Sequence, residues 1–310
     1  MSSVKNYLSL IKFSHTIFAM PFALIGFFLG IRKLPTANLN GVLYLFEPPM
    51  YQKIILFFQF RWYIFLLVIA CMIFARSAAM AFNRYLDRDI DASNPRTAIR
   101  EIPSGIISSR NALAFTIGSC ILFIICTWFI NIMCFLLSPV ALFVILFYSY
   151  TKRFTSLCHL VLGLGLSLAP IGAYLAVTGV FHWLPLLFSF AVICWVSGFD
   201  IIYALQDEGF DRQHNLQSIP ARLGKKNALM VSVFLHMFSA GFVIIAGFTG
   251  GFGWLYWIGT GVFCALLIYQ HSLVKPIDIS RVNIAFMTAN GIASVVFAFF
   301  VILDLWLKAL

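Results

Sequence analysis

Apolar residues occur along this chain in long runs, and short polar stretches separate one run from the next. An α-helix of about 20 apolar residues is long enough to cross the hydrocarbon core of a bilayer. Transmembrane β-strands would show shorter segments of alternating polarity. The pattern therefore predicts an all-α integral membrane protein, a bundle of nine transmembrane helices over residues 13–31, 62–82, 111–131, 133–150, 157–178, 184–204, 228–248, 252–270 and 286–307.

Residues 34–60 interrupt this regularity. Their two apolar segments, 43–46 and 54–60, are too short to cross a bilayer, and Glu47-Pro48-Pro49 lies between them. We expect this part of the chain to lie at the outer membrane interface. No low-complexity region or separate soluble part is visible, so residues 1–310 are predicted to form a single transmembrane domain.

Composition supports the membrane assignment, since 62% of the residues are hydrophobic and only 10% are charged. Soluble domains carry roughly 25% charged residues. The net charge of +10 could indicate a nucleic-acid partner. In a membrane protein, however, Lys and Arg accumulate in the cytoplasmic loops. The lipid bilayer is thus the predicted partner, and no nucleic acid is expected.

The basic residues also predict the orientation. If the N-terminus and the loops after the second, fourth, sixth and eighth predicted helices share one side, that side holds 15 of the 21 Lys and Arg. Five others fall on the opposite side: Arg32, Lys33, Lys53, Arg61 and Lys308. Arg76 falls inside the second predicted helix. The N-terminus is therefore predicted to be cytoplasmic.

Acidic residues are rare and clustered. Eight of the 11 lie in two stretches on the predicted cytoplasmic side: Asp87, Asp89, Asp91 and Glu101, then Asp200, Asp207, Glu208 and Asp211. A carboxylate within the bilayer costs at least about 2.5–3.5 kcal/mol and usually serves a function. Surface ion pairs with neighbouring arginines are the alternative explanation for these residues.

The spacing within each stretch selects particular residues. Asn83, Asp87 and Asp91 follow one another at intervals of four, which places them along one face of a helix. Asp207 and Asp211 repeat this interval in the second stretch. Carboxylate and amide oxygens are hard ligands of the kind that Mg²⁺ prefers.

Two acidic helices that face each other suggest two Mg²⁺ ions that clamp a diphosphate. Asp200 lies two helical turns before Asp207, and Tyr203 falls near the same face. Nearby basic side chains could hold phosphate oxygens from outside the metals: Arg88, Arg96, Lys152 and Arg153. A cation-coupled transporter is a different reading, because Gly163, Gly165 and Pro170 could break the fifth predicted helix. An assembly protein that binds partners through the acidic clusters is a third.

The two acidic stretches resemble the paired motifs of the UbiA-type membrane prenyltransferases. The first match is Asn83-x-x-x-Asp87-x-x-x-Asp91, continued by Asn94-Pro-Arg-Thr97. The second is residues 198–211, which include Asp207 and Asp211. Smaller matches are His15 to Pro21 and Tyr150 to Arg153. Arg84 departs from the pattern, since many members have Asp directly after the Asn.

The resemblance implies a Mg²⁺-dependent transfer of a polyprenyl group from polyprenyl diphosphate to an aromatic acid. Its branch is similar to the 4-hydroxybenzoate polyprenyltransferases of respiratory quinone (ubiquinone) biosynthesis. The alternative acceptor is the dihydroxynaphthoate of the futalosine route to menaquinone. The resemblance also implies a bacterial inner membrane location, with the active site on the cytoplasmic side.

The same resemblance implies roles for individual residues. The catalytic carboxylates would be Asp87, Asp91, Asp207 and Asp211, and these with Asn83 would be the metal ligands. The substrate-binding residues would be Asn83, Arg88, Arg96, Lys152, Arg153, Asp200 and Tyr203, with Asp200 orienting Arg or Tyr side chains. His15, Tyr150 and Arg153 are candidate contacts of the acceptor's carboxylate.

Overall fold

The computed structural model describes residues 3–11, 18–37, 41 and 48–307. Its helices are α1 (Ser3–Leu10), α2 (Met20–Lys33), α4 (Met50–Leu86), α5 (Arg88–Ser93), α6 (Ser109–Ile130), α7 (Ile132–Thr151), α8 (Cys158–Thr178), α9 (Trp183–Ala204), η2 (Leu205–Asp207), α10 (Glu208–Gln213), α11 (Ile219–Thr249), α12 (Trp254–Leu273), η3 (Ile284–Ala289) and α13 (Asn290–Leu307).

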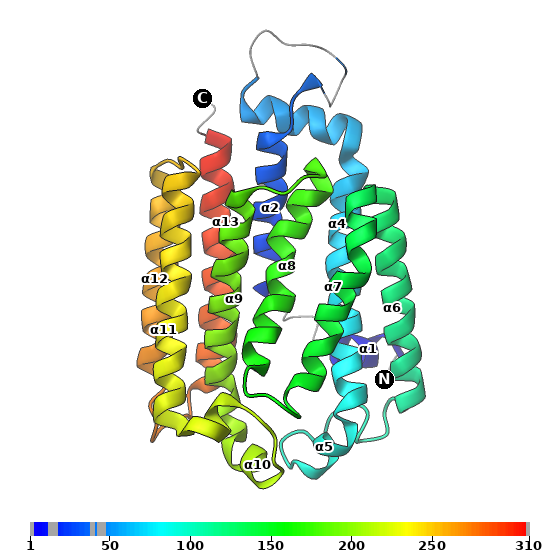
Figure 1. Cartoon of the computed structure of the whole chain (residues 1–310), viewed down its shortest axis with the longest axis vertical. Helices are drawn as coiled ribbons and strands as arrows, with labels where there is room; N and C mark the ends of the chain where they lie inside the picture. The colour runs from blue at the N-terminus through cyan, green and yellow to red at the C-terminus, as the bar shows by residue number, and fades with distance from the viewer. Residues whose placement is uncertain (1–2, 12–17, 38–40, 42–47, 308–310) are drawn as a thin grey trace.

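The predicted all-α fold is confirmed for the described part of the chain, which contains no β-strand beyond an isolated bridge between Lys275 and Asp278. Seven helical segments there are long and apolar enough to cross a membrane: Met50–Leu86, Ser109–Ile130, Ile132–Thr151, Cys158–Thr178, Trp183–Gln213, Ile219–Thr249 and Ile284–Leu307. Helices α2 and α12 run alongside them in the bundle (Figure 1). The nine crossings stay a prediction.

Helix α4 is much longer than the segment 62–82 that hydropathy predicts. It bends at Arg61, whose φ and ψ of −135° and 25° are not helical. Its first part lies across the end of the bundle in Figure 1, as expected of an interfacial segment. The other apolar segment of this region, 43–46, lies outside the described residues.

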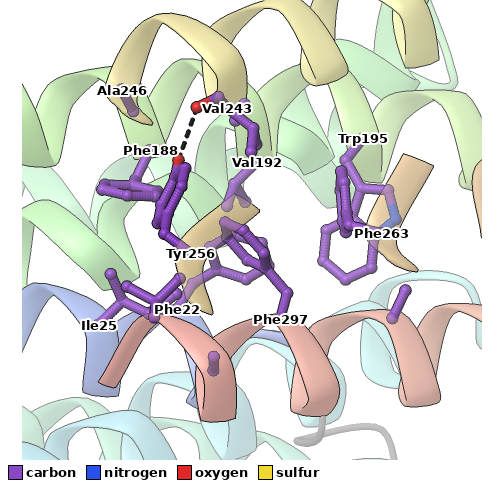
Figure 2. Packing of buried hydrophobic residues seen from close by; sticks show 14 of the residues in the cluster. Phe22, Ile25, Phe188, Val192, Trp195, Val243, Ala246, Tyr256, Phe263 and Phe297 are labelled. Carbon is purple, nitrogen blue, oxygen red and sulfur yellow. Dashed lines mark hydrogen bonds between the residues drawn. The ribbon is translucent and has the colours of Figure 1, made fainter. Parts of the chain in front are cut away.

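The bundle has one half whose core is densely packed (Figure 2). Large side chains of α2, α9, α12 and α13 meet there, among them Phe22, Trp195, Phe263 and Phe297. The hydroxyl of Tyr256 donates to the carbonyl oxygen of Val243 at 2.6 Å, which satisfies the polar atom within this apolar cluster. This half therefore acts as a rigid support for its neighbours.

Helix α8 lies between the packed half and the group formed by α4, α6 and α7 (Figure 1). Its contact with α2 is close, because a Cβ atom added at Gly26 would lie 1.9 Å from the carbonyl oxygen of Pro170. Despite Pro170, α8 is one helix from Cys158 to Thr178. The break that the transporter reading expects near Gly163, Gly165 and Pro170 is not present.

The two acidic stretches lie at the same end of the bundle, where α5 and α10 are neighbours in Figure 1. Helix α1 belongs to this end as well, since the hydroxyl of Ser9 donates to the carboxylate of Glu101 at 2.5 Å. The last turns of α2 and α13 and the first part of α4 lie at the opposite end (Figure 1). The fold thus collects most of the acidic residues at one end of the molecule.

Candidate active site

Two segments more than a hundred residues apart form the candidate site. Arg96, which follows α5, binds the carboxylate of Asp207 through Nε at 2.9 Å and Nη2 at 2.5 Å. The amide of Asn94 also donates to Asp207, at 3.4 Å. The ring of Tyr203 lies under the guanidinium of Arg96, and its hydroxyl accepts from Nη1 at 3.4 Å. The first and second acidic stretches are therefore in direct contact.

The first stretch bends at Asp87 but keeps its helical spacing, because the Asp87 N–H donates to the Asn83 carbonyl oxygen at 2.9 Å and the Asp91 N–H to the Asp87 carbonyl oxygen at 2.7 Å. Helix α4 ends at Leu86, Asp87 has φ and ψ of −91° and 8°, and α5 begins at Arg88. The side chain of Arg153 explains the break, because its Nη2 binds both the Leu86 carbonyl oxygen at 3.1 Å and the Asp87 carboxylate at 2.7 Å. A carbonyl at the helix end is satisfied outside the helix.

Asp87 lies between the amide of Asn83, which donates to it at 3.0 Å, and the guanidinium of Arg153. Burial raises the pKa of the Asp87 carboxyl above its ordinary value, and the attraction of Arg153 offsets only part of this effect. Because Asn83 donates through its nitrogen, its amide oxygen stays available as an acceptor or ligand. This pair fits the predicted ligand roles.

Asp91 is buried, with only 5% of its surface exposed. Arg100 contacts its carboxylate at 2.6 Å, and Arg84 lies 3.8 Å from it. Arg84, the departure from the family motif, is itself buried. The extra cation therefore has a structural partner, and the two arginines hold Asp91 in place.

Asp211 of α10 is fully buried and lies 2.7 Å from the Nζ of Lys152, at the end of α7. Burial alone would lower the pKa of Lys152, but the carboxylate of Asp211 raises it above the ordinary value. Lys152 is therefore charged at neutral pH. It joins α7 to the second acidic stretch, as Arg153 joins α7 to the first.

Two predicted residues have other partners. Asp200 contacts Nδ1 of His159 at 2.6 Å, and its expected role of orienting an Arg or a Tyr stays a prediction. The backbone N–H of Ile219 donates to Nε2 of His159 at 3.3 Å, so Nδ1 carries the proton that Asp200 accepts. Arg88 donates to the Tyr85 carbonyl oxygen and lies near the exposed Asp89, away from the other carboxylates.

An apolar cavity of about 330 Å³ opens between α4, α6, α7 and α8. Tyr148 lines it, near the end of α7. Arg76 also lines the cavity, and its Nε is buried without a hydrogen-bond partner in the described part of the chain. The lining residues Met80 of α4 and Tyr148 of α7 lie about one helical turn before Asn83 and Lys152, so the cavity extends from near the carboxylate end into the membrane-spanning region.

The sequence reasoning assigned no role to Arg76, Tyr148 or His159. A signal existed for Arg76, because a lone Arg within a membrane helix is costly and usually functional. Nothing in the sequence pointed to Tyr148 or His159. Of the proposed acceptor contacts, Tyr150 lies beneath the guanidinium of Arg153, and His15 is outside the described residues.

The donor set fits Mg²⁺. Among the described residues, no three or more His, Cys, Asp or Glu side chains gather as a ready-made metal site. Mg²⁺ needs only one or two protein carboxylates, because water and substrate phosphates complete its shell. The Oδ2 of Asp91 is buried without a hydrogen-bond partner in the described structure, and Arg84 lies 3.8 Å from it. The Oδ1 of Asp211 forms the ion pair with Lys152.

Comparison with known proteins gives a consistent result. The model of the UbiA prenyltransferase family matches residues 57–301. A 4-hydroxybenzoate octaprenyltransferase of Francisella tularensis subsp. novicida is 30% identical over 230 residues, which cover 73% of this chain and 80% of that protein. The enzyme of the same name from Nitrosospira multiformis is 30% identical over 247 residues, covering 79% and 84%.

Solved structures show the same fold. The apo structure of a UbiA homolog from Aeropyrum pernix K1 superposes with a TM-score of 0.77 and 30% identity, over 94% of this chain and 98% of that one. A UbiA homolog from Archaeoglobus fulgidus bound to GPP and Mg²⁺ has a TM-score of 0.71 at 18% identity, over 97% and 99%. The latter similarity concerns the fold alone.

Proposed function

Because the chain belongs to the UbiA prenyltransferase family and is a membrane prenyltransferase, we propose that it transfers a polyprenyl group from polyprenyl diphosphate to an aromatic acid. The proposed acceptor is 4-hydroxybenzoate, prenylated at the carbon ortho to its hydroxyl. The observation that carries the proposal is the apolar cavity, which is lined by the buried cation of Arg76 and comes within about one helical turn of Asn83 and Lys152 at the carboxylate site.

The donor's diphosphate would bind among the carboxylates and cations at the end of the bundle. Asn83, Asp87 and Asp91 would hold one Mg²⁺, and Asp207 and Asp211 the other. Mg²⁺ supplies positive charge that neutralises the phosphate oxygens and stabilises the leaving diphosphate. Arg96, Lys152 and Arg153 are close enough to these carboxylates to donate hydrogen bonds to the same phosphate oxygens.

The acceptor would lie deeper, within the cavity. A buried guanidinium with an unpartnered nitrogen is costly in an apolar site, and a carboxylate would satisfy it by a charge-assisted hydrogen bond. Arg76 is therefore the proposed partner of the acid group. Tyr148 lines the same cavity about one helical turn before Lys152, so it would lie close to the place where ring and donor meet.

The reaction follows from this placement. Cleavage of the carbon–oxygen bond leaves an allylic cation, the electron-rich ring attacks it, and loss of the ring proton restores aromaticity. The cation must be kept from water, and the apolar walls of the cavity exclude water from it. The prenyl chain requires an apolar channel as well, and the same cavity provides one.

We further propose that the chain crosses a bacterial inner membrane nine times, with α2 and α12 as the two crossings beyond the seven apolar helices. The excess of Lys and Arg at the carboxylate end supports a cytoplasmic location for that end. Respiratory quinone biosynthesis is the corresponding process, and the relatives' name supports the benzoate acceptor over the dihydroxynaphthoate.

The test is a membrane assay that offers 4-hydroxybenzoate and the dihydroxynaphthoate together, with Mg²⁺ and one polyprenyl diphosphate. Mass spectrometry of the lipid extract identifies the product. Prenylated hydroxybenzoate supports the proposal, whereas prenylated naphthoate would move the enzyme to the menaquinone route. Formation of neither product from an intact, folded protein would contradict both.

A further inference from the structure

The glycines of α8 serve two different purposes. A Cβ atom at Gly163 would lie 2.5 Å from the Ser197 Oγ and 2.6 Å from the Ile193 carbonyl oxygen, so this glycine permits close packing on α9. Gly165 and Gly172 line the cavity instead. A Cβ atom at Gly165 would come no nearer than 3.9 Å to another residue, and one at Gly172 would meet nothing within 4 Å.

Other small residues continue this open face. Ala169 lies between the two cavity glycines, and positions 165, 169 and 172 share one side of a helix. Across the cavity lie Ala75 of α4 and Ala141 of α7. Packing does not require glycine at 165 or 172, so the absence of side chains there creates the width of the cavity.

The two cavity glycines lie at different distances from the carboxylate end of the bundle. Helix α8 begins at Cys158, whose thiol contacts the Gln217 carbonyl oxygen, and the Gln217 N–H donates to the Lys152 carbonyl oxygen at 2.7 Å. The start of α8 is therefore at the carboxylate end. Gly165 is nearer to that end, and Gly172 lies seven residues, or about 10 Å, further along the helix. The two glycines mark two depths of one apolar channel.

We propose that the isoprene chain of the donor runs along this face of α8, and that Gly165 and Gly172 determine the donor length that the enzyme accepts. The inference rests on the proposed function. A larger side chain at either position would fill space that the isoprene chain of the donor occupies. The obstruction at Gly165 acts on isoprene units near the diphosphate, and the one at Gly172 on units further away.

The experiment compares Gly165→Leu and Gly172→Leu with the wild type, using a series of donors from geranyl to octaprenyl diphosphate and the acceptor that the wild type prenylates. For Gly172→Leu, kcat/KM for octaprenyl diphosphate relative to geranyl diphosphate falls by at least about tenfold, because overpacking penalises only the chain that reaches this depth. For Gly165→Leu the fall begins at a shorter donor.

Gly261→Leu is the matched control. Gly261 is an exposed glycine of α12 whose added Cβ would meet nothing within 4 Å, and it does not line the cavity. The donor preference of Gly261→Leu should equal that of the wild type.

Ala141→Leu narrows the cavity from α7 and should reproduce the length-dependent loss. It therefore tests the inference even if a glycine variant does not fold. Thermal unfolding in detergent reports folding of each variant.

The outcomes separate this inference from the proposed function. A wild type that prenylates its acceptor, with folded cavity variants that lose all donors equally or none, overturns the role of α8 and leaves the function intact. A folded wild type that transfers no donor to either acceptor overturns the proposed function and the inference with it. A donor-length cutoff that moves from Gly172→Leu to Gly165→Leu supports both.

Discussion

Each of the four candidate metal-binding carboxylates pairs with a different cation. Asp87 binds Arg153, Asp91 binds Arg100, Asp207 binds Arg96 and Asp211 binds Lys152. Three of these pairs join segments far apart in the chain, whereas Asp91 and Arg100 belong to the same acidic stretch. Opposite charges therefore alternate within one small region, and a diphosphate with its metals would find partners of both signs there.

Replacing Asp207 by Asn tests the metal role at one residue. The amide keeps the shape but loses the charge that a divalent cation requires, so we expect kcat/KM to fall at least about a hundredfold. Initial rates in purified membranes measure the effect at saturating Mg²⁺. Asp89→Asn is the control, because the Asp89 carboxylate is exposed and lies only near Arg88. Equal activity of both variants would contradict the assignment.

Arg76→Gln tests the acceptor site. The variant removes the buried cation proposed to bind the acid group, so KM for the acceptor should rise by roughly ten- to a hundredfold. The KM for the prenyl diphosphate should change little, since the proposed contact is with the acceptor. Arg88→Gln provides a surface comparison. An unchanged acceptor KM in a folded Arg76→Gln protein would rule out this contact.

At the level of elements, α8 is the helix on which the site depends. One face of α8 packs on α2, where Gly26 leaves no room for a side chain, and on α9, where Gly163 of α8 leaves none. Another face of α8 borders the cavity. The His159 ring, near the start of α8, connects Asp200 of α9 to the backbone of Ile219 at the start of α11. Movement of α8 would therefore disturb the packed half and the cavity together.

Gly26→Val tests the packing of α2 on α8. Its added atoms would overlap the Pro170 backbone, and we expect a loss of roughly 1–3 kcal/mol in stability. A lowered unfolding temperature in detergent measures it. Gly118→Val on α6 is the comparison, because a Cβ atom there meets nothing within 4 Å. Similar unfolding temperatures for the two variants would contradict the close contact.

For the whole molecule, transfer should depend on a divalent cation. Removal of Mg²⁺ by EDTA should abolish activity, and excess Mg²⁺ should restore it, because the carboxylate pairs cannot bind a diphosphate without a metal between them. Product formation by membranes is the readout. Full activity in a chelated sample would contradict the proposed metal role.

The orientation predicts where each end of the protein lies. With nine crossings and a cytoplasmic N-terminus, the C-terminus is on the outer side. A C-terminal alkaline phosphatase fusion should therefore be active, and a C-terminal green fluorescent protein fusion dark. Fusions at Asn227, beyond the second acidic stretch, should give the opposite result. A fluorescent C-terminal fusion would refute the nine-crossing arrangement.

The fold class followed from the sequence because membrane-crossing helices require long apolar runs, and these are visible without any tertiary information. Boundaries were less predictable. Helix α4 extends to both sides of the predicted segment 62–82, and α11 begins at Ile219 with a bend at Gly224, whose φ of 75° favours glycine. Hydropathy does not detect polar helical turns beyond the apolar run.

The candidate site was only partly predictable. Spacing drew attention to Asp87, Asp207 and Asp211, because acidic residues beside apolar runs are rare. Spacing did not predict the bend at Asp87, where the Arg153 side chain, over sixty residues away, binds the Leu86 carbonyl oxygen and the Asp87 carboxylate. Ion pairs of this kind depend on which segments meet, so no local pattern contains them.

By itself, then, the sequence determined that this is a helical membrane protein with two acidic stretches at one end, since apolar length and charge placement are properties of the chain. Only the tertiary structure decided that Arg96 contacts Asp207, that Asp200 binds His159, and that the open face of α8 borders a cavity reaching Arg76. These features arise from contacts between distant segments, and such contacts exist only once the helices have packed.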